Sequence, residues 1–190
     1  RVLLPLLGGF QVSNALCALA LALASGDDAE AATAELEKLQ GVPGRVQLAG
    51  RHPAGAPVYV DYAHTPAALA CVLKALRPHA QGRLHLVFGC GGDRDSGKRL
   101  EMGTIAEKLA DVVIVTDDNP RTEDAADIRA QILAAVPAAA DIGDRAQAIA
   151  EAVNGLGPGD LLVVAGKGHE QGQIIGEETR PFDDAEAVGV

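Results

Sequence analysis

Short apolar runs alternate with helix-length segments between residues 57 and 165, and this rhythm constrains the fold more than any other feature of the chain. The clearest run, Val112–Val115, is β-branched and apolar on both faces, as a central parallel strand must be. Strands that alternate with helices predict the α/β class, with a mostly parallel, doubly wound sheet and right-handed crossovers. We expect strands at 57–61, 83–89, 111–116, 139–142 and 160–165, and helices at 66–77, 99–110, 124–136 and 145–154.

The first forty residues follow a helical pattern instead. We expect one helix at 13–25, with Ser13 or Asn14 as its N-cap, and a second at 28–40 with Asp27 as its N-cap. The first helix is apolar on every face, which predicts burial against a partner.

A segment rich in glycine and proline at 41–44 marks a linker. We therefore expect two parts, 1–43 and 44–190. Because the chain does not start with Met, we also expect it to be a piece of a longer protein.

The composition argues against several classes of protein. A net charge of -10 and an aromatic content of 3% provide neither a basic stripe nor a stacking platform, so we expect no nucleic-acid partner. The longest apolar run, 15–24, is too short to span a bilayer, and no signal peptide is recognisable, so we expect no membrane partner. Cys17, Cys71 and Cys90 form no C-x-x-C pair, which predicts neither a metal site nor a disulfide framework.

Four polar residues follow the strand expected at 111–116. Asp118, Asn119, Pro120 and Arg121 would lie at the carboxyl end of that strand, where open α/β sheets bind ligands. They combine a carboxylate, an amide, a rigid turn residue and a planar cation with five donors. This set suits a small zwitterion, although a solvated turn that caps the next helix is the alternative.

Two further loops bring similar chemistry to the same edge. After the strand at 57–61, His64 and Thr65 follow Tyr62 and could contact a nucleotide's base or ribose, or could cap the next helix. After the strand at 160–165, Glu170 could hold an ammonium group or could be a solvated residue at a helix start. We interpret Lys167 and His169 as supporting residues.

The fourth loop, 89–99, is rich in glycine. It matches most of a P-loop signature, but Arg99 stands where a Ser or Thr should bind Mg²⁺. We interpret it as a loop that lets the backbone approach an anion while Arg94, Lys98 and Arg99 supply cationic donors.

Four motifs in order resemble the MurE-type Mur ligases: V-D-Y-A-H-T-P at 60–66, G-C-G-G-D-R-D-x-G-K-R at 89–99, T-D-D-N-P-R at 116–121 and A-G-K-G-H-E at 165–170. These ATP-dependent ligases add the third amino acid to UDP-N-acetylmuramoyl-L-alanyl-D-glutamate in peptidoglycan synthesis, through an acyl phosphate. The resemblance implies that 44–190 is their Rossmann-like C-terminal domain and that 1–43 is the helical end of their central ATP-binding domain.

In that family, the D-N-P-R motif marks ligases that choose meso-diaminopimelate over lysine. The resemblance implies that the diaminopimelate site comprises Arg94, Asp118, Asn119, Pro120, Arg121, Gly166 and Glu170. It implies a catalytic Lys98 near the phosphates and nucleotide contacts from Asn14, Arg45, Asp61, Tyr62 and His64.

The resemblance also implies the reactants and the setting. ATP, Mg²⁺, the UDP-N-acetylmuramoyl dipeptide and meso-diaminopimelate would be the cofactors and partners, in a monomeric enzyme of the bacterial cytoplasm. Most Mg²⁺ ligands and the P-loop of the family are missing from these 190 residues, so we expect no metal site here and no ligase or ATPase activity from the chain alone. Gln11 and Gln47 replace an Asn and a Glu that are usual in the family.

Two alternatives belong to other classes of function. One is a related amide ligase of the cyanophycin synthetase or folylpolyglutamate synthase type, and the other is a binding module for an amino acid without catalysis. The related amide ligases need no Asn-Pro-Arg for a distal carboxylate, and a P-loop domain encoded upstream of Arg1 would favour a ligase over the binding module.

Overall fold

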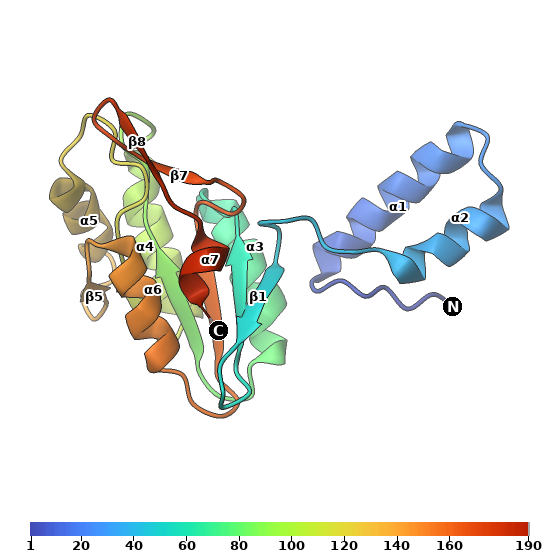
Figure 1. The fold of residues 1–190 in the computed structure, drawn as a ribbon, viewed down its shortest axis with the longest axis horizontal. Helices are drawn as coiled ribbons and strands as arrows, with labels where there is room; N and C mark the ends of the chain where they lie inside the picture. The colour runs from blue at the N-terminus through green and yellow to red at the C-terminus, as the bar shows by residue number, and fades with distance from the viewer. Residues whose placement is uncertain (190) are drawn as a thin grey trace. The chain divides into compact units, whose positions relative to one another are not determined.

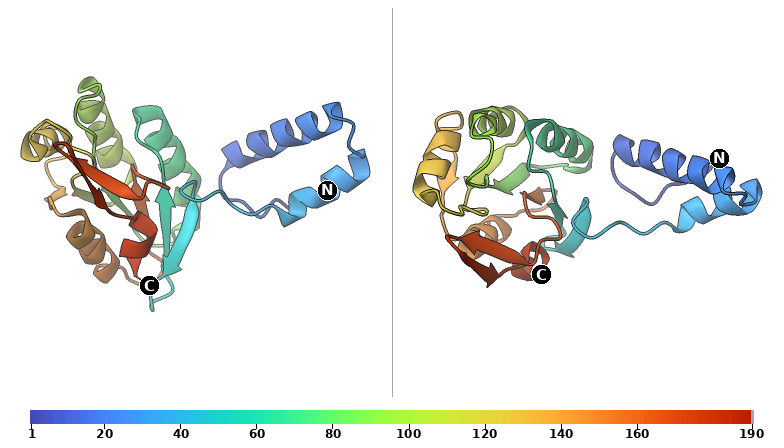
Figure 2. Two further views of the ribbon diagram at one scale, coloured as in Figure 1. Left: turned by 45° about the horizontal axis from the view of Figure 1, so that its top comes forward. Right: turned by 90° about the horizontal axis from the view of Figure 1, so that it is seen from above.

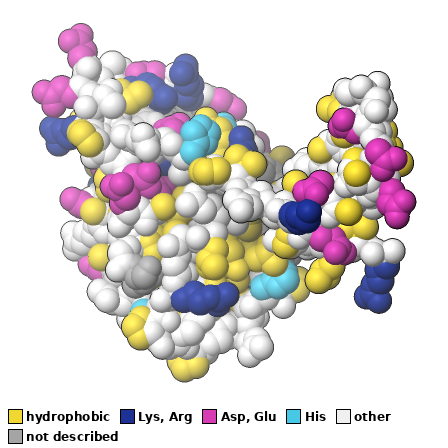
Figure 3. Space-filling model, turned by 45° about the vertical axis from the view of Figure 1, so that its right-hand side comes forward, with side chains coloured by type: hydrophobic (Ala, Val, Ile, Leu, Met, Phe, Trp, Pro, Cys, Tyr) yellow, Lys and Arg dark blue, Asp and Glu magenta, His cyan; other side chains and the backbone are white. Residues whose placement is uncertain are grey.

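The computed structural model describes residues 1–189 and divides into two compact units, Arg1–Val42 and a larger unit that begins at Pro43 (Figure 1). The first unit contains helix α1 (Gly9–Ala24), helix α2 (Ala29–Glu35) and the short 3-10 helix η1 (Leu36–Lys38). Its apolar side chains are largely exposed, and hydrophobic atoms lie on its surface in Figure 3. Within this unit, α1 buries only Gln11 and Ala15.

Both helix starts in this unit differ from the prediction. Helix α1 begins before Ser13 and Asn14, because Gly8, at φ 98°, ends the extended segment and its carbonyl oxygen already accepts from Gln11 N at 3.0 Å. Helix α2 is capped by Asp28 rather than Asp27: a side-chain oxygen of Asp28 accepts from Ala31 N at 2.9 Å.

A six-stranded sheet forms the centre of the larger unit. Its order is β1-β2-β6-β3-β4-β5, with four parallel pairs and one antiparallel pair between β1 and β2. The predicted α/β class and the mostly parallel, doubly wound sheet are therefore confirmed. The strands are β1 (Gln47–Arg51), β2 (Pro57–Asp61), β3 (Leu84–Phe88), β4 (Val112–Val115), β5 (Ala140–Asp141) and β6 (Leu161–Ala165).

Helices cover both faces of the sheet, as Figure 2 shows. One face carries α3 (Pro66–Leu76, followed by the 3-10 helix η2, Arg77–His79), α4 (Gly97–Leu109) and α5 (Ala125–Leu133). The other carries α6 (Arg145–Asn154) and α7 (Asp184–Val188). Because both faces are covered, every residue of β3 and β6 is buried, which explains their uninterrupted apolar sequences.

Side chains cap several of these helices. Thr65 caps α3, Asp124 caps α5 and Asp144 caps α6. The alternative that Asp118 and Asn119 cap the helix after β4 is therefore wrong, because Asp124 occupies that position.

Four elements of the fold were not predicted from the sequence. Besides β1 and α7, a separate hairpin forms from β7 (Gly172–Ile175) and β8 (Glu178–Pro181). Among residues 1–189, no helix is both long enough and apolar enough to cross a membrane.

Candidate amino-acid and nucleotide site

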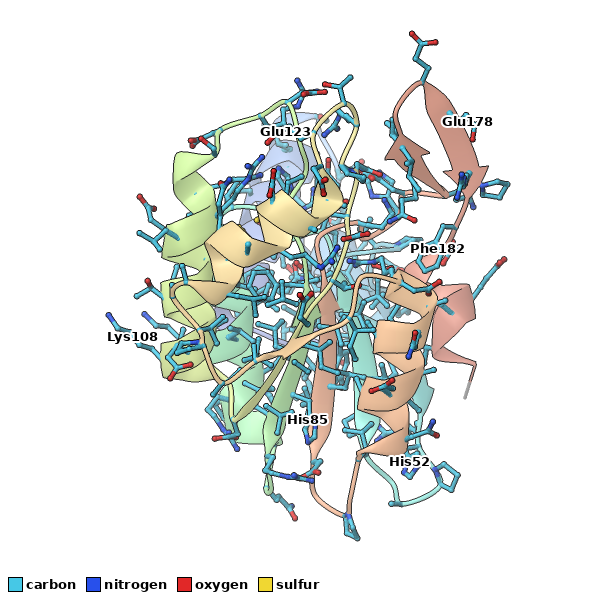
Figure 4. The ribbon with its side chains drawn as sticks, turned by 90° about the vertical axis from the view of Figure 1, so that its left-hand side faces the viewer. His52, His85, Lys108, Glu123, Glu178 and Phe182 are labelled. Carbon is cyan, nitrogen blue, oxygen red and sulfur yellow. The ribbon has the colours of Figure 1, made fainter. Side chains whose placement is uncertain are left out.

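The loops that follow β2, β3, β4 and β6 meet at the carboxyl edge of the sheet and enclose one cavity of about 490 Å³. Figure 4 labels Glu123 near this edge and His85 toward the opposite edge. The cavity is polar, as the sequence predicts for a zwitterion site. It is lined by Tyr62, His64, Thr65, Gly91, Arg94, Asp95, Lys98, Asp118, Asn119, Arg121, Gly166 and Glu170.

Nine of the predicted site residues line this cavity, and four do not. Pro120 is buried beneath it, Asp61 is buried at the end of β2, and Arg45 is exposed on the loop before β1. Asn14 belongs to the other unit, where its Nδ2 donates to Gln11 Oε1 at 3.0 Å.

Asn119 and Glu170 form the acidic side of the cavity. Asn119 Oδ1 accepts from Lys167 Nζ at 2.8 Å and from Ile174 N at 2.9 Å, so the oxygen end of the amide is fixed by two donors. Asn119 Nδ2 then donates to Glu170 Oε2 at 2.9 Å. Within the described residues, no hydrogen bond reaches Glu170 Oε1, which leaves one carboxylate oxygen for a ligand.

Gly166 shapes the same side of the cavity. Its φ is 120°, and a Cβ at this position would lie 2.9 Å from Asp118 Oδ2. Both the backbone angle and the space favour glycine, so Asp118 can sit against the loop that follows β6.

Arg121 forms the basic side and has an unusual backbone. Its φ is 53°, in the left-handed region that residues other than glycine seldom adopt. Strand β7 holds this conformation, because Arg121 N donates to Ile174 O at 3.1 Å and Gly176 N donates to Arg121 O at 2.7 Å. Strain that neighbouring contacts maintain is typical of binding sites.

The guanidinium of Arg121 is held at one end only. Nη1 donates to Gly92 O at 2.8 Å and to Asn119 O at 3.4 Å. Among residues 1–189, Nε and Nη2 donate to no acceptor, so one edge of the guanidinium is available for a carboxylate.

The glycine-rich loop packs against the loop that follows β4. A Cβ on Gly92 would lie 1.9 Å from Pro120 O, and one on Gly91 would lie 2.8 Å from Arg121 Nη1. These glycines therefore allow the two loops to approach each other closely. From the sequence alone, they are interpreted as positions where the backbone could approach an anion.

The three cations of this loop have different environments. Arg99 is 1% exposed and donates to Glu123 Oε1 at 2.8 Å and Gln131 Oε1 at 3.0 Å. The prediction that Arg99 supplies a donor to a ligand is therefore wrong. Arg94 is exposed at the cavity, and Lys98 Nζ, also at the cavity, donates to His64 O at 2.9 Å.

A cluster of rings lies beside the cavity. The rings of Tyr62 and His64 meet edge to face with centroids 4.5 Å apart, and His169 lies 5.3 Å from Tyr62. The guanidinium carbon of Arg45 lies 4.8 Å from the Tyr62 ring centroid. Flat π faces and a guanidinium are suitable contacts for a nucleotide.

Asp61 organises the backbone beside this cluster. Its two carboxylate oxygens accept from Val46 N and Ala63 N, both at 2.8 Å. Burial raises the pKa of Asp61, although these two N–H groups and Arg45 oppose the shift. Val46, at φ 50°, is held in a conformation that is rare for a β-branched residue.

A buried ion pair that the sequence analysis missed supports the cavity from below. Arg145 donates to both carboxylate oxygens of Asp184, at 2.7 and 2.8 Å, and to Ala165 O at 3.0 Å. It thereby connects α7 to the end of β6. A buried, paired arginine in a short helix gives no periodic signal that sequence alone reveals.

Within the described part of the chain, no group of three or more His, Cys, Asp or Glu side chains is arranged to hold a metal ion. The described residues alone therefore provide no ligand set of this kind for Mg²⁺.

The fold and the cavity define an α/β domain with a polar cavity at the carboxyl edge of its mostly parallel sheet. Residues 44–168 match the family described as "Mur ligase, glutamate ligase domain". The chain belongs to the Mur ligase family.

Two relatives have the same description, UDP-N-acetylmuramoyl-L-alanyl-D-glutamate–2,6-diaminopimelate ligase. The protein of Mesorhizobium japonicum is 61% identical over 185 residues, which cover 97% of this chain and 38% of that protein. A solved structure aligns with a TM-score of 0.76 and 44% identity, over 99% of this chain and 39% of that one.

A folylpolyglutamate synthase of Mycobacterium tuberculosis, solved with ADP and AMPPCP, is more distant. It aligns with a TM-score of 0.69 at 24% identity, over 86% of this chain and 38% of that one, and so shares the fold. The chain spans less than two fifths of the length of each of these three proteins.

Proposed function

We propose that this chain is the amino-acid-delivering part of a longer ATP-dependent ligase that adds meso-diaminopimelate to UDP-N-acetylmuramoyl-L-alanyl-D-glutamate. The observation that carries the proposal is that Arg121, with one free guanidinium edge, and Glu170, with one free carboxylate oxygen, line the same cavity. The relatives named above support the choice of amino acid, because they are described as 2,6-diaminopimelate ligases.

The charges of the cavity complement the distal end of diaminopimelate. That end carries one carboxylate and one ammonium on the same carbon. Nε and Nη2 of Arg121 would bind the carboxylate through two parallel hydrogen bonds, and Glu170 Oε1 would accept from the ammonium. Arg94, exposed at the same cavity, supplies a further cation for a carboxylate.

This arrangement explains a preference over lysine. Lysine lacks the distal carboxylate, so it would displace water from the Arg121 edge without replacing the lost hydrogen bonds. Leaving a partly buried cation unpaired costs about 1–3 kcal/mol, which corresponds to a factor of roughly 5 to 150 in selectivity.

The reaction itself requires positioning more than covalent help from this chain. In the Mur ligases, the substrate carboxyl becomes an acyl phosphate, the amine nitrogen attacks its carbon, and phosphate leaves as the amine loses a proton. Residues of this chain would hold the amine, while Arg45, Tyr62 and His64 would contact the nucleotide and Lys98 would lie near the phosphates.

The test is an amino-acid panel with the full-length protein. We expect ADP release in the presence of ATP, Mg²⁺ and the UDP-N-acetylmuramoyl dipeptide to require meso-diaminopimelate and to be at least about tenfold weaker with lysine. Activity with glutamate and a folate acceptor instead would favour the folylpolyglutamate synthase alternative. Binding of diaminopimelate with no ADP release under any condition would favour a non-catalytic module.

A further inference from the structure

Lys167 lies behind the cavity and touches three of its polar side chains. It is 0% exposed and does not line the cavity. Its Nζ lies 2.8 Å from Asn119 Oδ1, 3.4 Å from Glu170 Oε2 and 3.5 Å from Asp118 Oδ1. A lysine without exposure is uncommon, and each of its partners faces the ligand space.

These contacts fix the direction of two neighbouring groups. Because Lys167 Nζ and Ile174 N both donate to Asn119 Oδ1, the amide can only present Nδ2 to Glu170. Glu170 Oε2 is then bound by both Asn119 and Lys167, so Oε1 is the oxygen that remains for a ligand.

Lys167 also sets the charge of this side of the cavity. Asp118 and Glu170 contribute two negative charges, and Lys167 contributes one positive charge between them. The balance is one negative charge, which matches one substrate ammonium. The other buried cation nearby, Arg145, is already paired with Asp184 and does not alter this balance.

We propose that Lys167 is a positioning residue for the amino-acid substrate: it orients Asn119 and Glu170 and leaves a single negative charge for the substrate ammonium. This inference rests on the proposed function of the cavity. The proposed role of Lys167 differs from that of a purely structural salt bridge, because this buried cation affects the affinity for substrate through Glu170.

The experiment is a double-mutant cycle in the full-length ligase, with Lys167→Met and Glu170→Gln. Methionine keeps the length of the side chain and removes the charge. We expect Lys167→Met to raise KM for meso-diaminopimelate about tenfold or more, with a smaller change in kcat and none in KM for ATP. A loss of folded protein would lower the apparent kcat instead and would leave KM unchanged.

The double variant gives the sharper result. Once Glu170 is neutral, loss of Lys167 weakens the binding of diaminopimelate less. We therefore expect the increase in KM of the double variant to be at least about fivefold smaller than the product of the two single increases. Lys108→Met is the matched control, because Lys108 is exposed on α4, as Figure 4 shows; its effect should multiply with that of Glu170→Gln.

If Lys167→Met does not fold, Lys167→Gln replaces it in the cycle, since glutamine keeps an N–H donor for Asn119. A KM for diaminopimelate within twofold of the unmodified enzyme, or effects that multiply in the double variant, would overturn the role of Lys167. An unmodified enzyme that does not ligate diaminopimelate would overturn the proposed function instead, so the two failures are distinguishable.

Discussion

At the scale of single residues, a buried carboxylate far from the cavity and a partly buried one at the cavity differ in how completely their hydrogen bonds are filled. Asp160 is an example of the first kind: it accepts from Gly157 N at 3.0 Å, from Arg83 N at 2.7 Å and from His85 Nε2 at 3.1 Å. Glu170 is an example of the second kind, because only its Oε2 is bound within the described residues. The hydrogen bonds of Asp160 stabilise the sheet, whereas Glu170 Oε1 remains free to accept a hydrogen bond.

The network around Asp160 predicts that acid destabilises the fold. Burial lowers the pKa of His85, so the folded imidazole resists a proton that the unfolded chain binds below about pH 6.5. Burial would raise the pKa of Asp160, but hydrogen bonds from Gly157 and Arg83 outweigh it and hold that pKa well below its usual range. The stabilisation from His85 is therefore lost below about pH 6.5, and that from Asp160 below about pH 4.

The variant His85→Gln, which keeps a hydrogen-bond donor for Asp160, tests the contribution of His85 to this pH dependence. The free energy of unfolding of the unmodified chain, measured with urea, should fall between pH 7.5 and pH 5, and the variant should show a smaller fall. An equal slope in both proteins would mean that His85 is not the group responsible.

At the scale of elements, the β7–β8 hairpin holds the loop that carries the D-N-P-R motif. Gln173 Nε2 donates to Asp118 O at 2.7 Å, next to the backbone bonds between β7 and Arg121. The hairpin thus holds three of the four positions of the D-N-P-R motif, Asp118, Asn119 and Arg121, although it lies outside the main sheet.

This contact predicts an effect on affinity from a residue that does not line the cavity. Gln173→Ala should raise KM for meso-diaminopimelate about threefold to tenfold in the full-length enzyme, because one hydrogen bond to the loop is lost. The exposed neighbour Gln171→Ala is the control and should leave KM unchanged. Equal KM values for the two variants would show that the contact is dispensable.

The sequence predicted the central strands well, since buried parallel strands have uninterrupted apolar runs such as Leu161–Ala165. It did not predict β1 or β7. Strand β1 is interrupted by a register shift between Leu48 and Gly50, and β7 is a four-residue strand of intermediate burial. Neither has a clear alternation of apolar and polar residues.

The residues that line the cavity were predicted only in part, for a similar reason. Residues such as Asn119 and Glu170 carry their chemistry in the sequence, and strand order alone places them at one edge. The contacts of Lys167 and Gln173 join loops that are far apart in the sequence. Lys167 meets Asn119, which is 48 residues away, and Gln173 meets Asp118, which is 55 residues away. No local pattern encodes such contacts.

At the scale of the whole molecule, the larger unit contains the complete sheet and every residue that lines the cavity. The smaller unit exposes the large apolar side chains Val12, Leu16, Leu21 and Leu23 of α1. Exposed apolar groups of this kind favour association with another surface.

We therefore expect removal of residues 1–42 to leave the thermal midpoint of the remaining chain within about 3 °C and to reduce self-association. Calorimetry and sedimentation velocity on both lengths measure these effects. A large drop in the thermal midpoint would mean that the two units stabilise each other. Unchanged self-association of the shortened chain would mean that the associating surface lies outside residues 1–42.

The central claim, that Arg121 selects diaminopimelate, is tested most directly by the ratio of kcat/KM for meso-diaminopimelate to that for lysine in the full-length Arg121→Ala enzyme. Losing the charge-assisted pair should cost diaminopimelate about 2–5 kcal/mol, so the ratio should fall at least about 30-fold while KM for ATP stays the same. Arg180→Ala, at an exposed arginine of β8, should leave the ratio unchanged. An unchanged ratio in Arg121→Ala would contradict the account.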